Sequence, residues 1–170
     1  MKGHARQLLM LRHAKAGGER GGEDDFYRPL TSRGEKDALV AGQAILGRGW
    51  MPDLILCSPA RRTRSTLELV LEVLERDEEG LVRYEEALYN ASFETLLRFV
   101  QKCPLKVSRL MIVGHNPGLD HLLEWIAAAP PPRKDNGKLM TTAALACLET
   151  DAAWPDLAEG GARLVELIRP

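Results

Sequence analysis

With 170 residues, 45% of them hydrophobic and 28% charged, the chain has the composition of a single globular domain extending from residue 1 to residue 170. A formal net charge of −1 provides no overall field for nucleic acid or an anionic membrane, so neither is expected as a partner. The 3 cysteines form no CxxC pair, and the sequence contains no recognisable signal peptide or membrane-spanning apolar run, a combination that predicts a cytoplasmic protein.

The first predicted strand covers Leu8–Leu11, a run of apolar residues typical of a strand buried on both faces. Arg12 and His13 follow directly, so this strand carries a cation and an imidazole to its C-terminal tip. That pairing indicates an anion site with His13 as a candidate nucleophile. Lys15 is predicted to lie at the rim of the site, and a polar loop follows over residues 16–25.

The first predicted helix follows the segment Arg28-Pro29-Leu30-Thr31. Either Thr31 or Ser32 can serve as its N-cap, since Ser32 begins a capping-box sequence that ends at Glu35. Gly47 marks the expected end of this helix, because glycine is common just beyond a helix C-terminus.

The second buried strand is predicted at Leu54–Cys57, and Ser58-Pro59 follows it. Serine as N-cap with proline at the first helical position is a strong helix start. Arg62 lies one turn up the same helical face as Ser58, and helical side chains lean toward the N-terminus, so Arg62 is expected to reach the strand tip. Arg61 is rotated by about 100° and is expected to be solvated or structural.

The remaining elements continue the same alternation. A short strand near the edge of the sheet is predicted at Leu81–Tyr84, and Ser92 is predicted to cap a helix that closes before Pro104. The third buried strand, Leu110–Val113, leads through Gly114-His115-Asn116-Pro117 into another helix, with Asn116 and Pro117 in the cap and first positions.

The expected fold is therefore a three-layer α/β/α sandwich with a mostly parallel central sheet, because strands alternate with helices along most of the chain. Residues 129–138 hold three prolines, a glycine and charges, which predicts a surface loop. Two final strands, at 142–148 and 162–168, have no helical pattern between them and are expected to form an antiparallel edge.

Three of the predicted strands end in polar residues that can act together. Ligands bind outside the C-terminal ends of the strands in open α/β sheets, and helix N-termini there favour anions. Arg12, His13, Arg62 and His115 are thus expected around one point. Arginine pairs bidentately with phosphate oxygens, so the predicted ligand is a dianion such as a phosphoryl group.

Other phosphate-handling motifs do not match. A cysteine-based phosphatase needs Cys-x5-Arg, but counting from Cys57 the required position is occupied by Thr63. The GxxxxGK[ST] sequence of a P-loop is absent. The carboxylates around His115 and His121 do not form a metal-ligand set, so neither a metal nor another cofactor is expected.

The sequence resembles the histidine phosphatase superfamily, and within it the short SixA-type branch that includes phosphohistidine phosphatases. The resemblance spans roughly residues 8–150, implies a phosphoglycerate-mutase-like fold, and leaves no room for a large inserted lid. It rests on four motifs that match in order and spacing: Leu11-Arg12-His13-Ala14, Arg28-Pro29-Leu30-Thr31-x-x-Gly34, Ser58-Pro59-Ala60-x-Arg62-x-x-x-Thr66 and Val113-Gly114-His115-Asn116-Pro117.

The resemblance implies that His13 attacks phosphorus and forms a phosphohistidine intermediate, without a metal. Arg12, Arg62 and a protonated His115 would neutralise the phosphoryl oxygens in the transition state. The full set of residues expected to contact substrate is Arg12, Arg62, His115, Ser58, Asn116 and Arg28.

Glu86 is the candidate general acid, with its neighbour Glu85 as a rival and the acidic residues of the 16–25 loop (Glu19, Glu23, Asp24 and Asp25) as further alternatives. An alkoxide leaving group needs a proton, whereas imidazole leaves readily because the pKa of its conjugate acid is about 6.5. A site with a poor acid is therefore better suited to N–P bonds than to ordinary phosphomonoesters.

Three functions are consistent with these residues. The first is a phosphatase acting on a phosphohistidine-bearing protein, such as a histidine phosphotransfer domain. The second is a small-molecule phosphomonoesterase that uses the same chemistry. The third is a non-catalytic phosphoprotein-binding module, against which the retained His13 argues, since binding requires only the cations.

Overall fold

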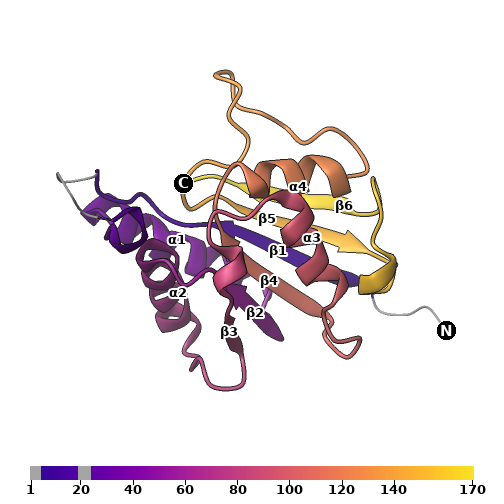
Figure 1. Cartoon of the computed structure of the whole chain (residues 1–170), viewed down its shortest axis with the longest axis horizontal. Coiled ribbons are helices and arrows are strands. Elements are labelled where there is room, and N and C mark those ends of the chain that lie inside the picture. Colours follow the sequence, from indigo (N-terminus) through magenta and orange to yellow (C-terminus); the bar gives the residue numbers. More distant parts are fainter. Residues whose placement is uncertain (1–4, 19–23) are drawn as a thin grey trace.

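The computed structural model describes residues 5–18 and 24–170, and its centre is a six-stranded sheet with the strand order β3-β2-β4-β1-β5-β6 (Figure 1). The strands β3, β2, β4 and β1 run parallel, whereas β5 is antiparallel to β1 and β6 is antiparallel to β5. The predicted antiparallel edge is therefore confirmed. The strands are β1 (Arg6–Arg12), β2 (Leu54–Cys57), β3 (Val82–Tyr84), β4 (Arg109–Gly114), β5 (Leu145–Thr150) and β6 (Arg163–Ile168).

Helices cover both faces of this sheet, as β1 illustrates. Leu8 and Met10 belong to one apolar core, which includes side chains of α3 and α4, while Leu9 and Leu11 belong to a second core with α1 and α2. Figure 1 shows α3 and α4 lying across one face of the sheet. The predicted three-layer arrangement is confirmed, with helices α1 (Ser32–Arg48), α2 (Arg61–Leu74), α3 (Phe93–Gln101) and α4 (Gly118–Ile126).

The cap predicted at Ser92 is confirmed, whereas α1 is capped by Thr31, the rival of the capping box that begins at Ser32. Thr31 rather than Ser32 caps α1, because its hydroxyl accepts a hydrogen bond from the amide of Gly34. Ser92 caps α3 by accepting from the amide of Thr95.

The other two helix starts differ from the prediction. Helix α2 begins at Arg61 rather than just after Ser58, since the Oγ of Ser58 lies 2.7 Å from Nε2 of His115 and serves that ring instead of the helix. Helix α4 begins at Gly118, with Pro117 as N-cap, although Oδ1 of Asn116 still accepts a hydrogen bond from the amide of Asp120 at 3.1 Å.

Strand β5 begins at Leu145 rather than at residue 142. Ala143 has a φ of 59°, and the amide of Ala144 donates to the carbonyl of Thr141, so the chain turns there before it enters the sheet. This turn leaves Thr142 free to line a pocket beside β1. In the described part of the chain, no helix is both long and apolar enough to cross a membrane.

Candidate active site

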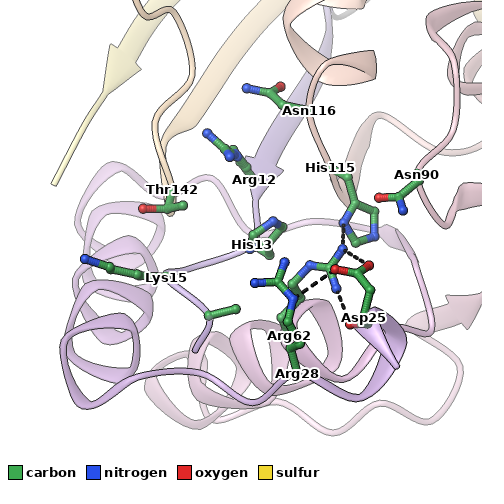
Figure 2. Close-up of a pocket in the computed structure, with 11 residues that line it drawn as sticks. Arg12, His13, Lys15, Asp25, Arg28, Arg62, Asn90, His115, Asn116 and Thr142 are labelled. Carbon is green, nitrogen blue, oxygen red and sulfur yellow. Dashed lines mark hydrogen bonds and ion pairs between the residues drawn. The ribbon is translucent and has the colours of Figure 1, made fainter. Parts of the chain in front are cut away.

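A cavity of about 410 Å³ lies where β1 and β4 end and α2 begins (Figure 2). The strand tips and helix termini that the sequence predicts to meet at this edge of the sheet do meet there. The cavity is strongly basic, since arginines and lysine outnumber its one carboxylate. Its lining consists of Arg12, His13, Lys15, Ala16, Asp25, Arg28, Arg62, Asn90, His115, Asn116 and Thr142.

The ring of His13 is held in one tautomer. Its Nδ1 lies 2.8 Å from the backbone carbonyl of Ala14, and a carbonyl can only accept, so Nδ1 carries the proton. Nε2 therefore keeps its lone pair, and the structure leaves that atom as the nucleophilic one. Burial, with Arg62 and Arg12 adding repulsion, lowers the pKa of His13 to about 4, so the ring is neutral at physiological pH.

His115 is fixed by two hydrogen bonds. Nη2 of Arg62 lies 3.2 Å from its Nδ1, and because a guanidinium can only donate, Nδ1 is the acceptor. Nε2 then carries the proton and donates to the Oγ of Ser58 at 2.7 Å. Burial, followed by repulsion from Arg62, lowers the pKa of His115 to about 3. In the free protein this ring is therefore neutral, because it accepts from a cation; the protonated His115 expected in the transition state concerns the complex with a phosphoryl group.

The hydroxyl of Thr66 connects the nucleophile to helix α2. It accepts a hydrogen bond from the amide of Ala14 at 2.9 Å and donates to the carbonyl of Arg62 at 2.7 Å. Thr66 is fully buried, so this bridge is shielded from water. Arg62 and Thr66 both belong to the motif Ser58–Thr66. The bridge through Thr66 therefore sets the position of His13 relative to Arg62.

The segment around Thr31 performs a similar task for the chain that follows His13. The carbonyl of Lys15 accepts from both the amide and the hydroxyl of Thr31, at 2.9 and 3.2 Å. Gly34 lies against the same carbonyl, and a Cβ at that position would collide with it. The glycine of the Arg28–Gly34 motif is therefore required by close approach of two backbones.

Asp25 is the one carboxylate that lines the cavity. Its Oδ2 accepts from Arg62 at 3.1 Å, and its Oδ1 accepts from Arg28 at 2.9 Å (Figure 2). The same Oδ2 also accepts from the hydroxyl of Tyr89 at 2.5 Å. These contacts, that of Tyr89 first, lower the pKa of Asp25 to about 2. The carboxylate is consequently ionised and occupies donors of Arg62 that face the pocket.

Three buried arginine Nε atoms, those of Arg6, Arg12 and Arg62, have no hydrogen-bond partner in the described part of the chain, and Arg12 and Arg62 line the cavity. Guanidinium groups pair with phosphate and carboxylate oxygens, so this lining favours an anionic ligand. Arg12 is anchored on its other side, where Nη1 donates to the carbonyl of Met140 at 2.9 Å.

A sequence profile of the histidine phosphatase superfamily (branch 1) matches residues 8–96, just over half of the chain. The chain belongs to the histidine phosphatase superfamily. An uncharacterized protein of Mycobacterium tuberculosis is 31% identical to this histidine phosphatase over 160 residues, covering 91% of this chain and 96% of the relative. An uncharacterized chloroplastic protein of Arabidopsis thaliana is 31% identical over 132 residues, which make up 74% of this chain but 61% of that relative.

Solved structures agree with the family. A candidate phosphohistidine phosphatase SixA from Nakamurella multipartitia is 32% identical with a TM-score of 0.81, covering 100% of this chain and 99% of the other. A second SixA candidate, from Agrobacterium tumefaciens, is 28% identical with a TM-score of 0.80, covering 99% and 100%. The predicted phosphoglycerate-mutase-like α/β fold and the SixA-type resemblance are confirmed.

The remaining predicted site residues of this histidine phosphatase lie in different surroundings. Arg28 lines the cavity, but its Nε and Nη1 are bound to Asp25 and to the carbonyl of Gly17. Asn116 also lines it. Its side-chain Nδ2 donates to the carbonyl of Met140, and its Oδ1 accepts from the backbone amide of Asp120. Ser58 is fully buried behind His115 and does not line the cavity.

The predicted acids are also separated by the structure. Glu86 lies in a short 3-10 helix, is exposed, and is not among the residues that line the cavity; Glu85 precedes it and does not line the cavity either. Glu19 and Glu23 lie outside the described residues. Asp24 caps the 3-10 helix that begins at Asp25, which leaves Asp25 as the acidic residue of that loop that reaches the pocket.

Sequence reasoning assigned no role to Tyr89, Asn90 or the loop before β5. Tyr89 bonds Asp25 and stacks edge-on against His115, with ring centroids 5.5 Å apart. No sequence motif pointed to it, because the contact joins residues that are 64 positions apart. Among the described residues, no three His, Cys, Asp or Glu side chains are grouped as a metal site requires.

The two buried rings make the stability of this protein pH-dependent. An unfolded histidine titrates near 6.5, whereas folded His13 stays neutral down to about 4. Between those values the unfolded chain binds more protons, so the free energy of unfolding falls as the pH is lowered. We expect His13 alone to cost about 2 kcal/mol between about pH 7 and about pH 5.

Urea denaturation of wild type and His13→Asn at both pH values measures this contribution. The variant is expected to lose about 2 kcal/mol less than wild type over the interval. His121→Asn is the matched control, because His121 is exposed on α4. Identical losses in wild type and His13→Asn would contradict the prediction.

Proposed function

We propose that this protein hydrolyses phosphohistidine on a phosphorylated protein, such as a histidine phosphotransfer domain, by way of a phosphohistidine intermediate on His13. Nε2 of His13 attacks phosphorus, the P–N bond of the substrate breaks, and the substrate imidazole departs. Water then attacks the phosphorus on His13, so phosphate and the free enzyme are formed. The position of Arg12 and Arg62 in the cavity lining supports this role, since charge on the phosphoryl oxygens needs fixed cations.

One observation favours a phosphohistidine substrate over a phosphomonoester. Among the described residues, Asp25 is the carboxylate that lines the cavity. It is ionised and held by two arginines and a tyrosine, so it carries no proton for a leaving group. An alkoxide leaves slowly without a general acid. The ring of phosphohistidine can take a proton from water at its other nitrogen, so it departs as neutral imidazole without an acid from the enzyme.

Two further points support this substrate. The two SixA-type proteins with 32% and 28% identity are candidate phosphohistidine phosphatases, and they cover this chain almost completely. His13 and His115 are both neutral in the free protein. The imidazole ring of an incoming phosphohistidine therefore faces no imidazolium cation in the pocket.

A pair of peptides with one sequence tests the proposal, one carrying phosphohistidine and the other phosphoserine at the same position. We expect kcat/KM to favour phosphohistidine by about a thousandfold, the usual worth of a missing general acid. Equal or faster hydrolysis of phosphoserine, or of small alkyl phosphates, would overturn it. Glu86→Gln is assayed alongside, and a fall confined to the phosphoserine peptide would identify Glu86 as a working acid.

A further inference from the structure

A second basic pocket adjoins the active site. It encloses about 310 Å³ and shares Lys15 and Thr142 with the catalytic cavity. In Figure 2 these two residues lie on the side of His13 opposite to Asp25 and Asn90, so the second pocket extends the site away from the Arg62–Asp25 pair. Its lining consists of Lys15, Arg33, Asp37, Lys134, Lys138, Thr141, Thr142 and Pro170.

The charges of this pocket are mostly uncompensated. Arg33 pairs with Asp37 at 3.7 Å, but Lys15, Lys134 and Lys138 make no ion pair with any carboxylate in the part of the chain that the structure describes. Three ammonium groups around one hollow repel each other, and an anion bound between them removes that repulsion.

The loop that carries two of these lysines is fixed by the active site itself. The carbonyl of Met140 accepts from Nη1 of Arg12 and from the side-chain amide of Asn116, both at 2.9 Å, while its amide donates to Asp120 at 3.0 Å. Arg169 donates to the carbonyls of Leu139 and Pro132 and holds both arms of the loop.

The tip of this loop is a closed turn that holds the two lysines together. The amide of Lys134 donates to the carbonyl of Lys138 at 2.9 Å, and the amide of Gly137 donates back to Lys134 at 2.8 Å. Gly137 has a φ of 80°, which favours glycine there. Arg133 also donates to the carbonyl of Gly137, so the turn is internally bonded. These bonds fix the backbone from which Lys134 and Lys138 extend, so the two exposed side chains start from set positions beside the pocket.

We propose that the second pocket binds a second anionic group of the substrate, next to the phosphoryl group held by Arg12 and Arg62. This inference rests on the proposed function and narrows its substrate class. The preferred substrates carry negative charge beside the phosphoryl group, supplied either by acidic side chains flanking phosphohistidine on a protein or by a second phosphate on a small molecule. Lys134 and Lys138, on the turn at the tip of the loop, bind that negative charge. His13 performs the same chemistry on every substrate.

The protein arm of the test compares two phosphohistidine peptides that differ only in whether glutamate or glutamine flanks the phosphorylated residue. We expect wild type to favour the glutamate peptide by about tenfold in kcat/KM, and high salt to shrink the ratio. In Lys134→Ala/Lys138→Ala the ratio should fall to about one. The matched control is Lys102→Ala/Lys106→Ala, whose lysines precede β4 at the opposite end of the sheet and should keep the wild-type ratio.

The small-molecule arm measures inhibition by ethylene glycol bisphosphate and by methyl phosphate. A bisphosphate that inhibits about tenfold more tightly, with the difference lost in the turn variant, identifies a second phosphate as the source. If the two compounds have equal inhibition constants but wild type clearly prefers the glutamate peptide, the source of the charge is acidic side chains instead. A wild type that hydrolyses phosphoramidate but shows neither preference overturns the second pocket alone, whereas failure to hydrolyse phosphoramidate or either peptide overturns the proposed function.

Discussion

Replacing His13 by alanine is expected to abolish turnover, with kcat falling by about ten-thousandfold or more. The lone pair on Nε2, which the hydrogen bond from Nδ1 to the carbonyl of Ala14 sets free, has no substitute nearby. The ring of His115 lies 5.4 Å away, but it accepts from Arg62 and donates to Ser58 and so offers no free nitrogen. Among the described residues that line the cavity, His13 and His115 are the two imidazoles.

The measurement is twofold. Steady-state assays with phosphoramidate report turnover, and rapid quenching into alkali with a radiolabelled substrate reports the covalent phosphohistidine, which survives alkali. Label should appear on wild type and on His121→Ala, an exposed histidine of α4, and should be absent from His13→Ala. A variant that is folded but retains either label or appreciable turnover would show that another residue is the nucleophile.

Arg62→Ala is expected to lower kcat/KM by about a thousandfold, for two reasons that add. The variant removes a cation that lines the cavity. It also removes one of the two arginines that bind Asp25, so the ionised carboxylate, paired with Arg28 alone, is left to repel the phosphoryl dianion.

The second reason can be isolated with the double variant Arg62→Ala/Asp25→Asn. Removal of the carboxylate should recover about tenfold of the lost activity, although each single change weakens the same ion pair. Arg61→Ala is the matched control, since Arg61 is adjacent in sequence but exposed and outside the cavity lining. A double variant no more active than Arg62→Ala would show that Asp25 does not oppose the substrate, and thermal unfolding confirms that each variant is folded.

Sequence periodicity predicts the architecture because buried strands carry a local signal. Leu8–Leu11 and Leu110–Val113 are apolar without interruption. Each strand is buried between two helical layers, and a strand covered on both faces needs apolar side chains on both. Helix starts are predicted where the cap is purely local, as at Thr31 and Ser92. The prediction is wrong at Ser58, because a long-range partner, His115, takes the hydroxyl that a local rule assigns to the helix.

The catalytic constellation follows from the same local signals combined with one topological rule. Parallel strands place their C-terminal ends at one edge, so Arg12, His13, Arg62 and His115 are expected together from strand boundaries alone. Their protonation states do not follow, since burial and neighbouring arginines decide them. The sequence alone favours a protonated His115, and only the contact from Arg62 to Nδ1 shows the ring to be an acceptor.

Only the tertiary structure shows that Asp25 is the acidic partner of Arg62 and that a second pocket adjoins the site. Asp25 and Glu86 are equally acidic in sequence, but Asp25 is folded onto Arg62, 37 positions away, while Glu86 stays in solvent. Lys134 and Lys138 stand in a loop whose composition predicts only exposure, and contacts to Arg12 and Asn116 bring that loop to the site. The sequence by itself determined the buried strands, the cap at Ser92 and the polar residues at the strand tips, because each depends on neighbours along the chain. Partners brought together across the sheet depend on packing that no local pattern records.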